Sequence, residues 1–138
     1  MRLLKKGDQI LDLCAAPGGK SLHVADKMAG FGMVEARDLT EYKVGLIQEN
    51  IARAGVINVQ ARCMDATVLD IDSEDSADIV LADVPCSGYG VIGKKPDIKY
   101  KVTPSKQEEI VILQRKIFRP GSQLRKKRGE LLCTVPVR

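Results

Sequence analysis

The chain is poor in aromatic residues and histidine. Its 138 residues include no tryptophan, three tyrosines, two phenylalanines and one histidine. It has no apolar run of about 18 residues, which a membrane-spanning helix requires, and no signal-peptide pattern. Its four cysteines show no CxxC spacing and no histidine partners in metal-site order, which argues against a zinc site or a disulfide framework. We therefore expect one domain in the cytoplasm, with no membrane contact and no metal.

Charge is distributed unevenly along the chain. Residues 1–93 carry 9 Lys and Arg against 14 Asp and Glu, whereas residues 94–138 carry 13 against 4. The formal charges of the two parts are therefore −5 and +9. A basic segment of this kind attracts polyanions such as nucleic acid, but a solvated surface with an irregular tail explains the charge equally well.

Short apolar runs alternate with helical patterns. We expect strands at residues 9–14, 33–37, 59–62, 79–82 and 130–134, and helices at 19–28, 41–54 and 104–118. Thr40 is a predicted N-cap and Gly55 a predicted C-terminal glycine of the second helix, and Pro104 suits the first turn of the third. This order predicts an α/β fold in which helices cover both faces of a parallel sheet.

The two ends of the sequence predict a partial domain. The first expected strand begins within a few residues of Met1, and the last ends close to Arg138. A doubly wound sheet that stopped there would leave its fifth strand as an unprotected edge. We therefore expect a single partial domain over residues 1–138, truncated after the fifth strand, with self-association through that strand.

The segment from Asp12 to Lys20, Asp-Leu-Cys-Ala-Ala-Pro-Gly-Gly-Lys, is the most informative part of the chain. It lies between an expected strand and an expected helix, where a glycine turn lets the backbone approach a nucleotide-like ligand and presents helix N–H groups to an anion. A P-loop requires glycine where Cys14 stands, and a dinucleotide site requires G-x-G-x-x-G, which this segment does not supply. Both of these motifs are disfavoured.

Four acidic residues, Asp12, Asp38, Asp65 and Asp83, stand at or just beyond the ends of expected strands. Open α/β sheets bind ligands at this edge. A carboxylate after the second strand suits a ribose, because it accepts hydrogen bonds from both hydroxyls. Each residue alone is more often a turn or helix-cap aspartate, but their common position favours one ligand-binding edge.

A second motif, Asp83-Val-Pro-Cys-Ser-Gly-Tyr-Gly90, follows the fourth expected strand and precedes Lys94-Lys-Pro-Asp-Ile-Lys-Tyr100. It places the thiol of Cys86 and the carboxylate of Asp83 over the same edge. The nearby Lys94 and Lys95 would favour the thiolate form of Cys86 and bind phosphate. A lone cysteine is usually a small buried hydrophobe, which is our interpretation of Cys14.

Together these motifs resemble the RNA cytosine-5 methyltransferases, in particular the bacterial Sun/Fmu proteins, which methylate a cytosine in small-subunit ribosomal RNA. The resemblance covers about residues 5–118. It implies a Rossmann-like methyltransferase fold that uses S-adenosylmethionine, with Asp38 at the ribose, Asp65 beside the adenine and Asp83 near the methyl group. The other implied cofactor contacts are Cys14, Ala15, Ala16, Pro17, Gly18, Gly19 and Lys20. The implied partner is ribosomal RNA, bound through the basic segment 94–128.

The resemblance also implies a mechanism. A cysteine thiolate adds to carbon 6 of cytosine, which makes carbon 5 nucleophilic enough to attack the sulfonium methyl group. Asp83 and Cys86 are the implied catalytic residues: Asp83 hydrogen-bonds the base, and Cys86 assists release of the product. The target base must be unstacked, because it is reached from both faces.

In this family the nucleophile stands on the fifth strand in a Thr-Cys-(Ser/Thr) segment, at a set spacing after a Gly. Here Cys133 follows Gly129 by four residues, an odd number of positions earlier than that spacing, and it is followed rather than preceded by a threonine, Thr134. Since strand side chains alternate, an odd shift reverses the face to which the thiol points. We therefore expect the nucleophile of the family to be displaced or missing in this chain. Cys133 is a doubtful candidate for that role.

The stretch before Cys133 also departs from the family. The segment Arg119-Pro-Gly-Ser122 is expected to interrupt the third helix, and residues 125–128 are unusually basic. These departures predict a C-terminus that is truncated or frameshifted. We also expect this chain to lack the N-terminal RNA-binding region that members of the family carry.

Three functional hypotheses remain at the level of sequence. The chain is a catalytic core that methylates RNA cytosine, a non-catalytic S-adenosylmethionine-binding module or inert fragment, or a transferase on the same fold that methylates an exocyclic amine. The third class carries Asn/Asp-Pro-Pro-aromatic after the fourth strand, and the segment Val84-Pro-Cys86 argues against it. A usable cysteine on the fifth strand would separate the first two.

Overall fold

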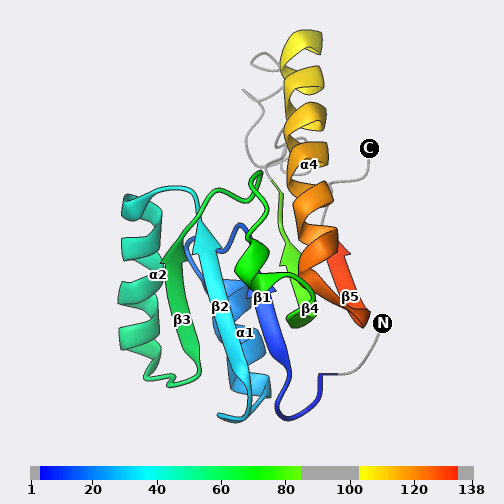
Figure 1. Cartoon of the computed structure of the whole chain (residues 1–138). Helices are drawn as coiled ribbons and strands as arrows, with labels where there is room; N and C mark the ends of the chain where they lie inside the picture. Colours follow the sequence, from blue (N-terminus) through cyan, green and yellow to red (C-terminus); the bar gives the residue numbers. More distant parts are fainter. Residues whose placement is uncertain (1–3, 85–102, 134–138) are drawn as a thin grey trace.

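The computed structural model describes residues 4–84 and 103–133. Five parallel strands form one sheet in the order β3-β2-β1-β4-β5, with helices on both of its faces (Figure 1). The strands are β1 (Gln9–Asp12), β2 (Met33–Asp38), β3 (Val59–Cys63), β4 (Ala77–Ala82) and β5 (Arg125–Cys133). The helices are α1 (Gly19–Lys27), α2 (Glu41–Ala54) and α4 (Pro104–Leu124), and a 3-10 helix, η1 (Ile71–Ser73), precedes β4. The predicted α/β fold is confirmed.

Alternate residues of the central strands supply two hydrophobic cores. Ile10 and Ile79 are partners in register and pack on the face covered by α1 and α2. Leu11 and Val80 are the next pair and pack on the face covered by α4. Strand side chains alternate between faces, so both faces of β1 and β4 are buried, as in other parallel sheets. The ends of these strands are thereby fixed in space.

Helix α2 begins and ends at the residues that its sequence predicts. The Thr40 hydroxyl accepts a hydrogen bond of 3.4 Å from the Lys43 N–H, and Gly55 closes the helix in the left-handed region with φ 65°. Val44 and Ile47 are buried against the sheet. A capped helix of this kind supports the loop that follows β1.

Helix α4 is longer than the sequence predicts. It continues through Pro120 to Leu124, so the predicted end at Phe118 and the predicted interruption after Arg119 are wrong. The proline removes one backbone donor, which ordinarily breaks or kinks a helix. Burial of the last turns against the sheet, with Leu124 only 2% exposed, outweighs that cost.

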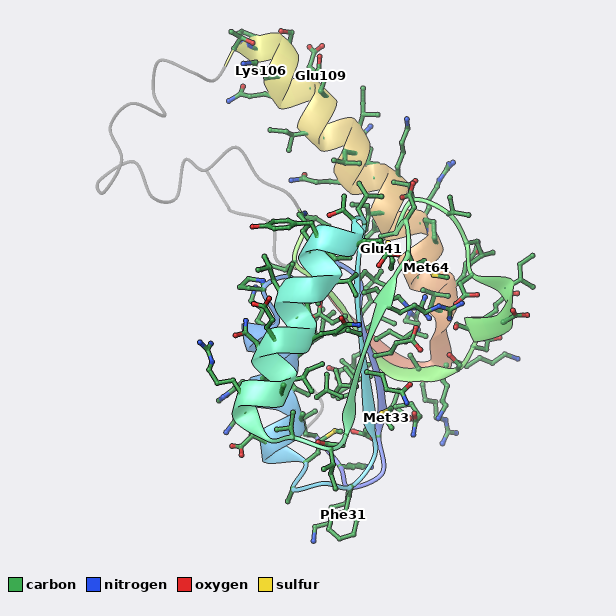
Figure 2. The ribbon with its side chains drawn as sticks, turned by 90° about the vertical axis from the view of Figure 1, so that its left-hand side faces the viewer. Phe31, Met33, Glu41, Met64, Lys106 and Glu109 are labelled. Carbon is green, nitrogen blue, oxygen red and sulfur yellow. The ribbon has the colours of Figure 1, made fainter. Side chains whose placement is uncertain are left out.

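The close contact between α4 and the sheet depends on Gly121. A Cβ atom built there would lie 2.9 Å from Leu13 Cδ1, which is closer than real Cβ contacts. The other end of α4, which carries Lys106 and Glu109, rises beyond the end of the sheet where Glu41 and Met64 lie (Figure 2). Helix α4 therefore packs on the sheet with its C-terminal part only.

Strand boundaries differ from the sequence prediction in several places, most of all at the start of β5. β1 ends at Asp12 rather than Cys14, and β5 begins at Arg125 rather than Glu130. β5 therefore includes the basic residues 125–128, and within the described residues it pairs with β4 alone. In the described part of the chain, no helix is both long and apolar enough to span a membrane.

Candidate active site

The carboxyl end of the sheet brings Asp12, Asp38 and Asp83 to the loop that follows β1. Asp12 ends β1, Asp38 ends β2, and Asp83 directly follows β4. These strands are parallel neighbours in the sheet, so their ends meet at one edge. The loop of residues 13–18, called the cofactor loop below, runs from β1 to α1 at this edge. The predicted position of these three acidic residues, at or just beyond the ends of strands, is confirmed.

Asp12 is the most buried of the acidic groups, with 1% of its surface exposed. Its Oδ2 accepts a hydrogen bond of 2.7 Å from the Ser21 hydroxyl. Its Oδ1 is buried without a hydrogen-bond partner among the described residues. Burial raises the pKa of the Asp12 carboxyl, while the Ser21 hydrogen bond, the backbone N–H of Cys14 and the Lys20 charge act against that rise. This carboxylate is available to a buried donor at the end of β1.

Asp38 holds the cofactor loop against the end of β2. Its Oδ2 accepts a hydrogen bond of 3.0 Å from the Ala16 N–H, and its Oδ1 accepts one of 2.8 Å from the Leu39 N–H. The Lys43 ammonium lies 3.0 Å from Oδ1. Asp38, which is the predicted ribose-binding residue, is therefore also a structural residue of the cofactor loop. A carboxylate has about four acceptor positions, so these contacts leave capacity for a ligand.

Further contacts fix the cofactor loop on its other sides. Asn50 of α2 donates a hydrogen bond of 2.8 Å to the Pro17 carbonyl, and the Ala15 N–H donates one of 2.8 Å to the Arg37 carbonyl. Gly18 has φ 104°, and a Cβ built on it would lie 3.4 Å from Ile47 Cγ2. At Gly19 a Cβ would meet no other atom within 4 Å. Gly18 thus serves the turn itself, whereas Gly19 leaves open space at the start of α1.

Lys20 and Asp83 form an ion pair across the carboxyl edge, from the first turn of α1 to the end of β4. Both side chains are partly exposed, at 54% and 44%. An exposed pair of this kind contributes little to stability. Its significance is position: it sets the Asp83 carboxylate beside the cofactor loop.

Asp65 lies in the connection between β3 and β4 rather than in the cofactor loop. Its Oδ1 accepts hydrogen bonds from the N–H and the hydroxyl of Thr67, at 2.8 and 2.7 Å. These bonds lower the pKa of the Asp65 carboxyl. The neighbouring Met64 N–H donates a hydrogen bond of 2.9 Å to the Asp38 carbonyl. The residue before Asp65 is therefore bonded to the end of β2, and Asp65 follows β3 at the same edge of the sheet.

The described cysteines have the features of structural thiols. Burial, assisted by the charges of Asp38 and Asp12, raises the pKa of Cys14 to about 12. Burial and the charge of Asp83 raise the pKa of Cys133, which pairs in register with Ala82 at the end of β4. Cys86, the cysteine implied in product release, lies outside the described residues. Among the residues that the structure describes, no three His, Cys, Asp or Glu side chains gather as a metal site.

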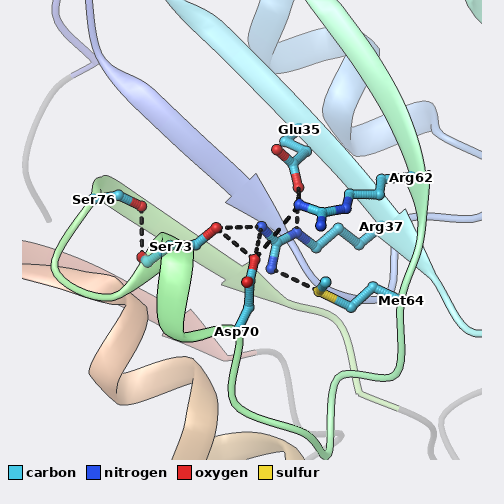
Figure 3. Close-up of polar contacts among 7 residues, drawn as sticks. All are labelled: Glu35, Arg37, Arg62, Met64, Asp70, Ser73 and Ser76. Atoms are coloured by element: carbon cyan, nitrogen blue, oxygen red, sulfur yellow. Dashed lines mark hydrogen bonds and ion pairs between the residues drawn. The ribbon is translucent and has the colours of Figure 1, made fainter.

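The sequence did not predict a buried polar cluster around Arg37 (Figure 3). The Arg37 side chain is 2% exposed and bonds to Glu35 at 2.6 Å and to Asp70 at 2.9 Å. Its other partners are Ser73 Oγ at 2.9 Å and Met64 Sδ at 3.2 Å. A signal was available: a charged residue on an internal strand that is buried on both faces must be paired.

Comparison with known proteins identifies close relatives. The family model described as 16S rRNA methyltransferase RsmB/F matches residues 2–137. The chain is 42% identical over 135 residues to the probable ribosomal RNA small subunit methyltransferase B of Bacillus subtilis, covering 95% of this chain and 30% of that protein. It is 37% identical over 144 residues to the human tRNA (cytosine(72)-C(5))-methyltransferase NSUN6, covering 94% of this chain and 30% of that protein. The chain thus spans about a third or less of these relatives.

Solved structures agree with these relatives. NSun6 from Pyrococcus horikoshii, crystallised with SFG, superposes with a TM-score of 0.81 at 33% identity, covering 91% of this chain and 32% of that one. A SAM-dependent methyltransferase from Aquifex aeolicus superposes with a TM-score of 0.68 at 16% identity, covering 95% and 57%. The second likeness shows the fold alone, which is the predicted Rossmann-like methyltransferase fold.

Proposed function

This chain belongs to the RsmB/F family of 16S rRNA methyltransferases, and from that premise we propose that it is part of an S-adenosylmethionine-dependent enzyme that forms 5-methylcytosine in ribosomal RNA. The observation that carries the proposal is the gathering of Asp12, Asp38 and Asp83 around the cofactor loop at one edge of the sheet. The family resemblance predicted from sequence is confirmed by the match over residues 2–137.

The site suits S-adenosylmethionine in charge. The cofactor carries a sulfonium and an ammonium group, and three carboxylates lie beside the cofactor loop, of which Asp83 pairs with Lys20 and Asp38 with Lys43. Asp12 Oδ1 is buried without a hydrogen-bond partner among those residues, which fits a cationic donor. The relative from Pyrococcus horikoshii was crystallised with SFG, an S-adenosylmethionine analogue. When bound, the cofactor supplies an electrophilic methyl group.

We assign the cofactor contacts as the sequence predicts. Asp38 accepts hydrogen bonds from the ribose hydroxyls, Asp65 lies beside the adenine, and Gly19 lets the ligand approach the first turn of α1. The remaining contacts are the backbone and side chains of residues 14–18 and Lys20. Calorimetric titration of the chain with S-adenosylhomocysteine tests this assignment: we expect micromolar affinity at best, and a folded chain that gives no binding heat would contradict it.

Asp83 is the catalytic acid that we propose to hydrogen-bond the cytosine. A hydrogen-bonding group fixed at the base edge favours the build-up of charge there as carbon 5 becomes nucleophilic. Cys86, three residues later in the sequence, is proposed to assist release of the product. A cysteine nucleophile must be a thiolate, and Cys133 has a raised pKa because it is partly buried near Asp83.

That raised pKa favours a second candidate, a non-catalytic S-adenosylmethionine-binding module. We expect weak or absent turnover from this chain alone. The test is mass spectrometry of ribosomal RNA incubated with the chain and isotopically labelled S-adenosylmethionine. Robust formation of labelled 5-methylcytosine would contradict the second candidate, and Cys133→Ser and Cys86→Ser variants would then identify the nucleophile.

We propose that the basic segment 94–128 binds the ribosomal RNA. On α4, a hollow of about 600 Å³ is lined by the cations Arg115, Lys116 and Arg119 and by apolar side chains such as Phe118. Cations contact phosphates, and an exposed aromatic ring stacks on unpaired bases. Lys116→Glu with Arg119→Glu should lower RNA affinity and flatten its dependence on salt. Lys27→Glu, on α1, makes the same kind of charge change away from α4 and serves as the control.

We further propose self-association through β5 and a cytoplasmic location, where ribosomes are found. A strand paired on one side offers backbone groups to a second chain. Analytical ultracentrifugation tests the first proposal, and a monomer at all concentrations would contradict it. Fluorescence microscopy of the tagged protein in its host tests the second, and a membrane or extracellular signal would contradict it.

A further inference from the structure

Two adjacent residues at the end of β2 join both segments that surround the proposed cofactor site. The Arg37 carbonyl accepts from the Ala15 N–H at 2.8 Å, and Asp38 Oδ2 accepts from the Ala16 N–H at 3.0 Å. On the other side, the Asp38 carbonyl accepts from the Met64 N–H at 2.9 Å. The cofactor loop and the β3–β4 connection, defined as residues 64–76, therefore meet at this point.

The Arg37 guanidinium extends this junction along the β3–β4 connection. Its Nη2 donates to Asp70 Oδ2 and Ser73 Oγ, both at 2.9 Å, and the Ser73 hydroxyl donates to the same carboxylate oxygen at 2.5 Å. Its Nη1 donates to Met64 Sδ at 3.2 Å (Figure 3). Met64 directly precedes Asp65 in the sequence. One side chain thus bonds both ends of the turn that carries Asp65.

Stability alone is a poor explanation of this arrangement. A buried guanidinium loses its hydration, and apolar residues of similar volume often stabilise a core as well as a buried ion pair does. Arginine differs from lysine in that its planar fork bonds several partners at fixed angles. The Glu35 bond of 2.6 Å to Nε fixes the plane of that fork. The cluster therefore fixes the geometry of the β3–β4 connection, which carries Asp65.

We propose that Arg37 is a positioning residue that holds the β3–β4 connection against the cofactor loop, so that Asp65 meets the adenine of the cofactor. The inference rests on the proposed function. A carboxylate beside the base accepts a hydrogen bond from the exocyclic amino group of adenine, whereas it repels the keto oxygen of hypoxanthine. The site should therefore prefer S-adenosylhomocysteine over S-inosylhomocysteine, and Arg37 should maintain that preference.

The experiment is calorimetric titration of the chain and its variants with these two ligands. Arg37→Lys keeps the charge but cannot bond four partners, so we expect about tenfold weaker binding of S-adenosylhomocysteine and a preference over the inosyl ligand reduced by about threefold or more. Arg62→Lys is the matched control: Arg62 lies 3.6 Å from both Glu35 and Asp70 but is 48% exposed. It should stay within about twofold of the unaltered chain.

The ratio of the two affinities, for S-adenosylhomocysteine and S-inosylhomocysteine, separates a positioning role from a role in stability. A general loss of folded protein weakens the binding of both ligands equally. An Arg37→Lys variant that folds and keeps both the affinity and the ratio overturns the inference. If that variant fails to fold, Ser73→Ala removes one Arg37 partner without changing charge, and an unchanged ratio overturns the inference in the same way. Hydrogen exchange should be faster in residues 64–76 of either variant and unchanged in α2.

Failure of the inference and failure of the proposed function give different results. If the unaltered chain binds neither ligand, the cofactor site itself is wrong. If it binds both ligands equally, the cofactor site stands, but the placement of Asp65 and the role of Arg37 are overturned. A preference that Arg37→Lys reduces and Arg62→Lys retains supports the inference.

Discussion

The hydroxyl of Ser21, in the first turn of α1, donates a 2.7 Å hydrogen bond to the buried carboxylate of Asp12 at the end of β1. This bond fixes the two ends of the cofactor loop relative to each other. We expect Ser21→Ala to lower the free energy of unfolding by about 1–3 kcal/mol, because it leaves a buried acceptor unsatisfied. Urea denaturation measures this difference.

The control for that variant is Ser122→Ala, which removes an exposed hydrogen bond of 2.7 Å to the Arg119 carbonyl. It should change the free energy of unfolding by less than about 0.5 kcal/mol. Equal effects of the two substitutions would show that burial of Asp12 has no energetic consequence.

The raised pKa of Asp12 predicts a pH dependence with a definite sign. The unfolded carboxyl titrates near the ordinary value of 3.8, and the folded one above it, so the folded state binds the proton more tightly. The contribution of Asp12 to stability therefore falls as pH rises through the window that begins near 3.8. Asp12→Asn does not titrate, so its stability relative to the unaltered chain should increase with pH across that window. A constant difference in urea denaturation from about pH 4 to about pH 7 would contradict the shift.

The two glycines of the cofactor loop should respond differently to alanine. Gly18→Ala forces a side chain into φ 104° against Ile47 and should cost about 1–2 kcal/mol of stability. Gly19→Ala places its methyl group in open space, so the melting temperature should not fall. Affinity for S-adenosylhomocysteine should fall in both variants, because the ligand approaches the backbone at Gly19. Unchanged affinity in a folded Gly19→Ala variant would argue against that approach.

The cysteines should differ in their rates of alkylation. With a pKa of about 12 against an ordinary 9.0, Cys14 has roughly a thousandfold less thiolate at neutral pH, and the pKa of Cys133 is raised as well. Peptide mass spectrometry after brief iodoacetamide treatment near neutral pH should therefore show little modification of either residue. We expect Cys86 to react first, because the sequence predicts that the nearby charges of Lys94 and Lys95 would favour its thiolate. Faster modification of Cys133 would make it the better candidate for the nucleophile.

Local signals predicted much of the fold. Thr40 and Gly55 fixed the ends of α2 because caps depend on neighbouring residues only. Pro120 misled the prediction of α4, since the burial that carries the helix onward comes from a sheet that is distant in sequence. β5 begins at Arg125 rather than at the predicted Glu130 for the same reason, because its partner β4 extends the pairing to Ala77↔Arg125.

The sequence predicted which acidic residues of the candidate site lie at strand ends. It did not predict the hydrogen bonds that connect the site to neighbouring loops. The positions of Asp12, Asp38 and Asp83 follow from topology, which the alternation of elements gives directly. The bond between Asp38 and the Ala16 N–H, and the cluster around Arg37, depend on side-chain contacts between separate loops. Such contacts leave no periodic pattern in a single sequence, apart from the conflict between a charged residue and a buried strand.

The central place of β1 has a consequence for synthesis on the ribosome. β1 is made first but lies between β2 and β4, and the Leu13 N–H donates to the Leu81 carbonyl at 2.9 Å. A nascent chain therefore carries the complete loop sequence long before the strand that borders it has emerged. Until β4 follows, the unpaired backbone edge of β1 is open to chaperones and to other nascent chains. Assembly of the site is thus timed by the arrival of residues 77–83, not by that of the loop itself.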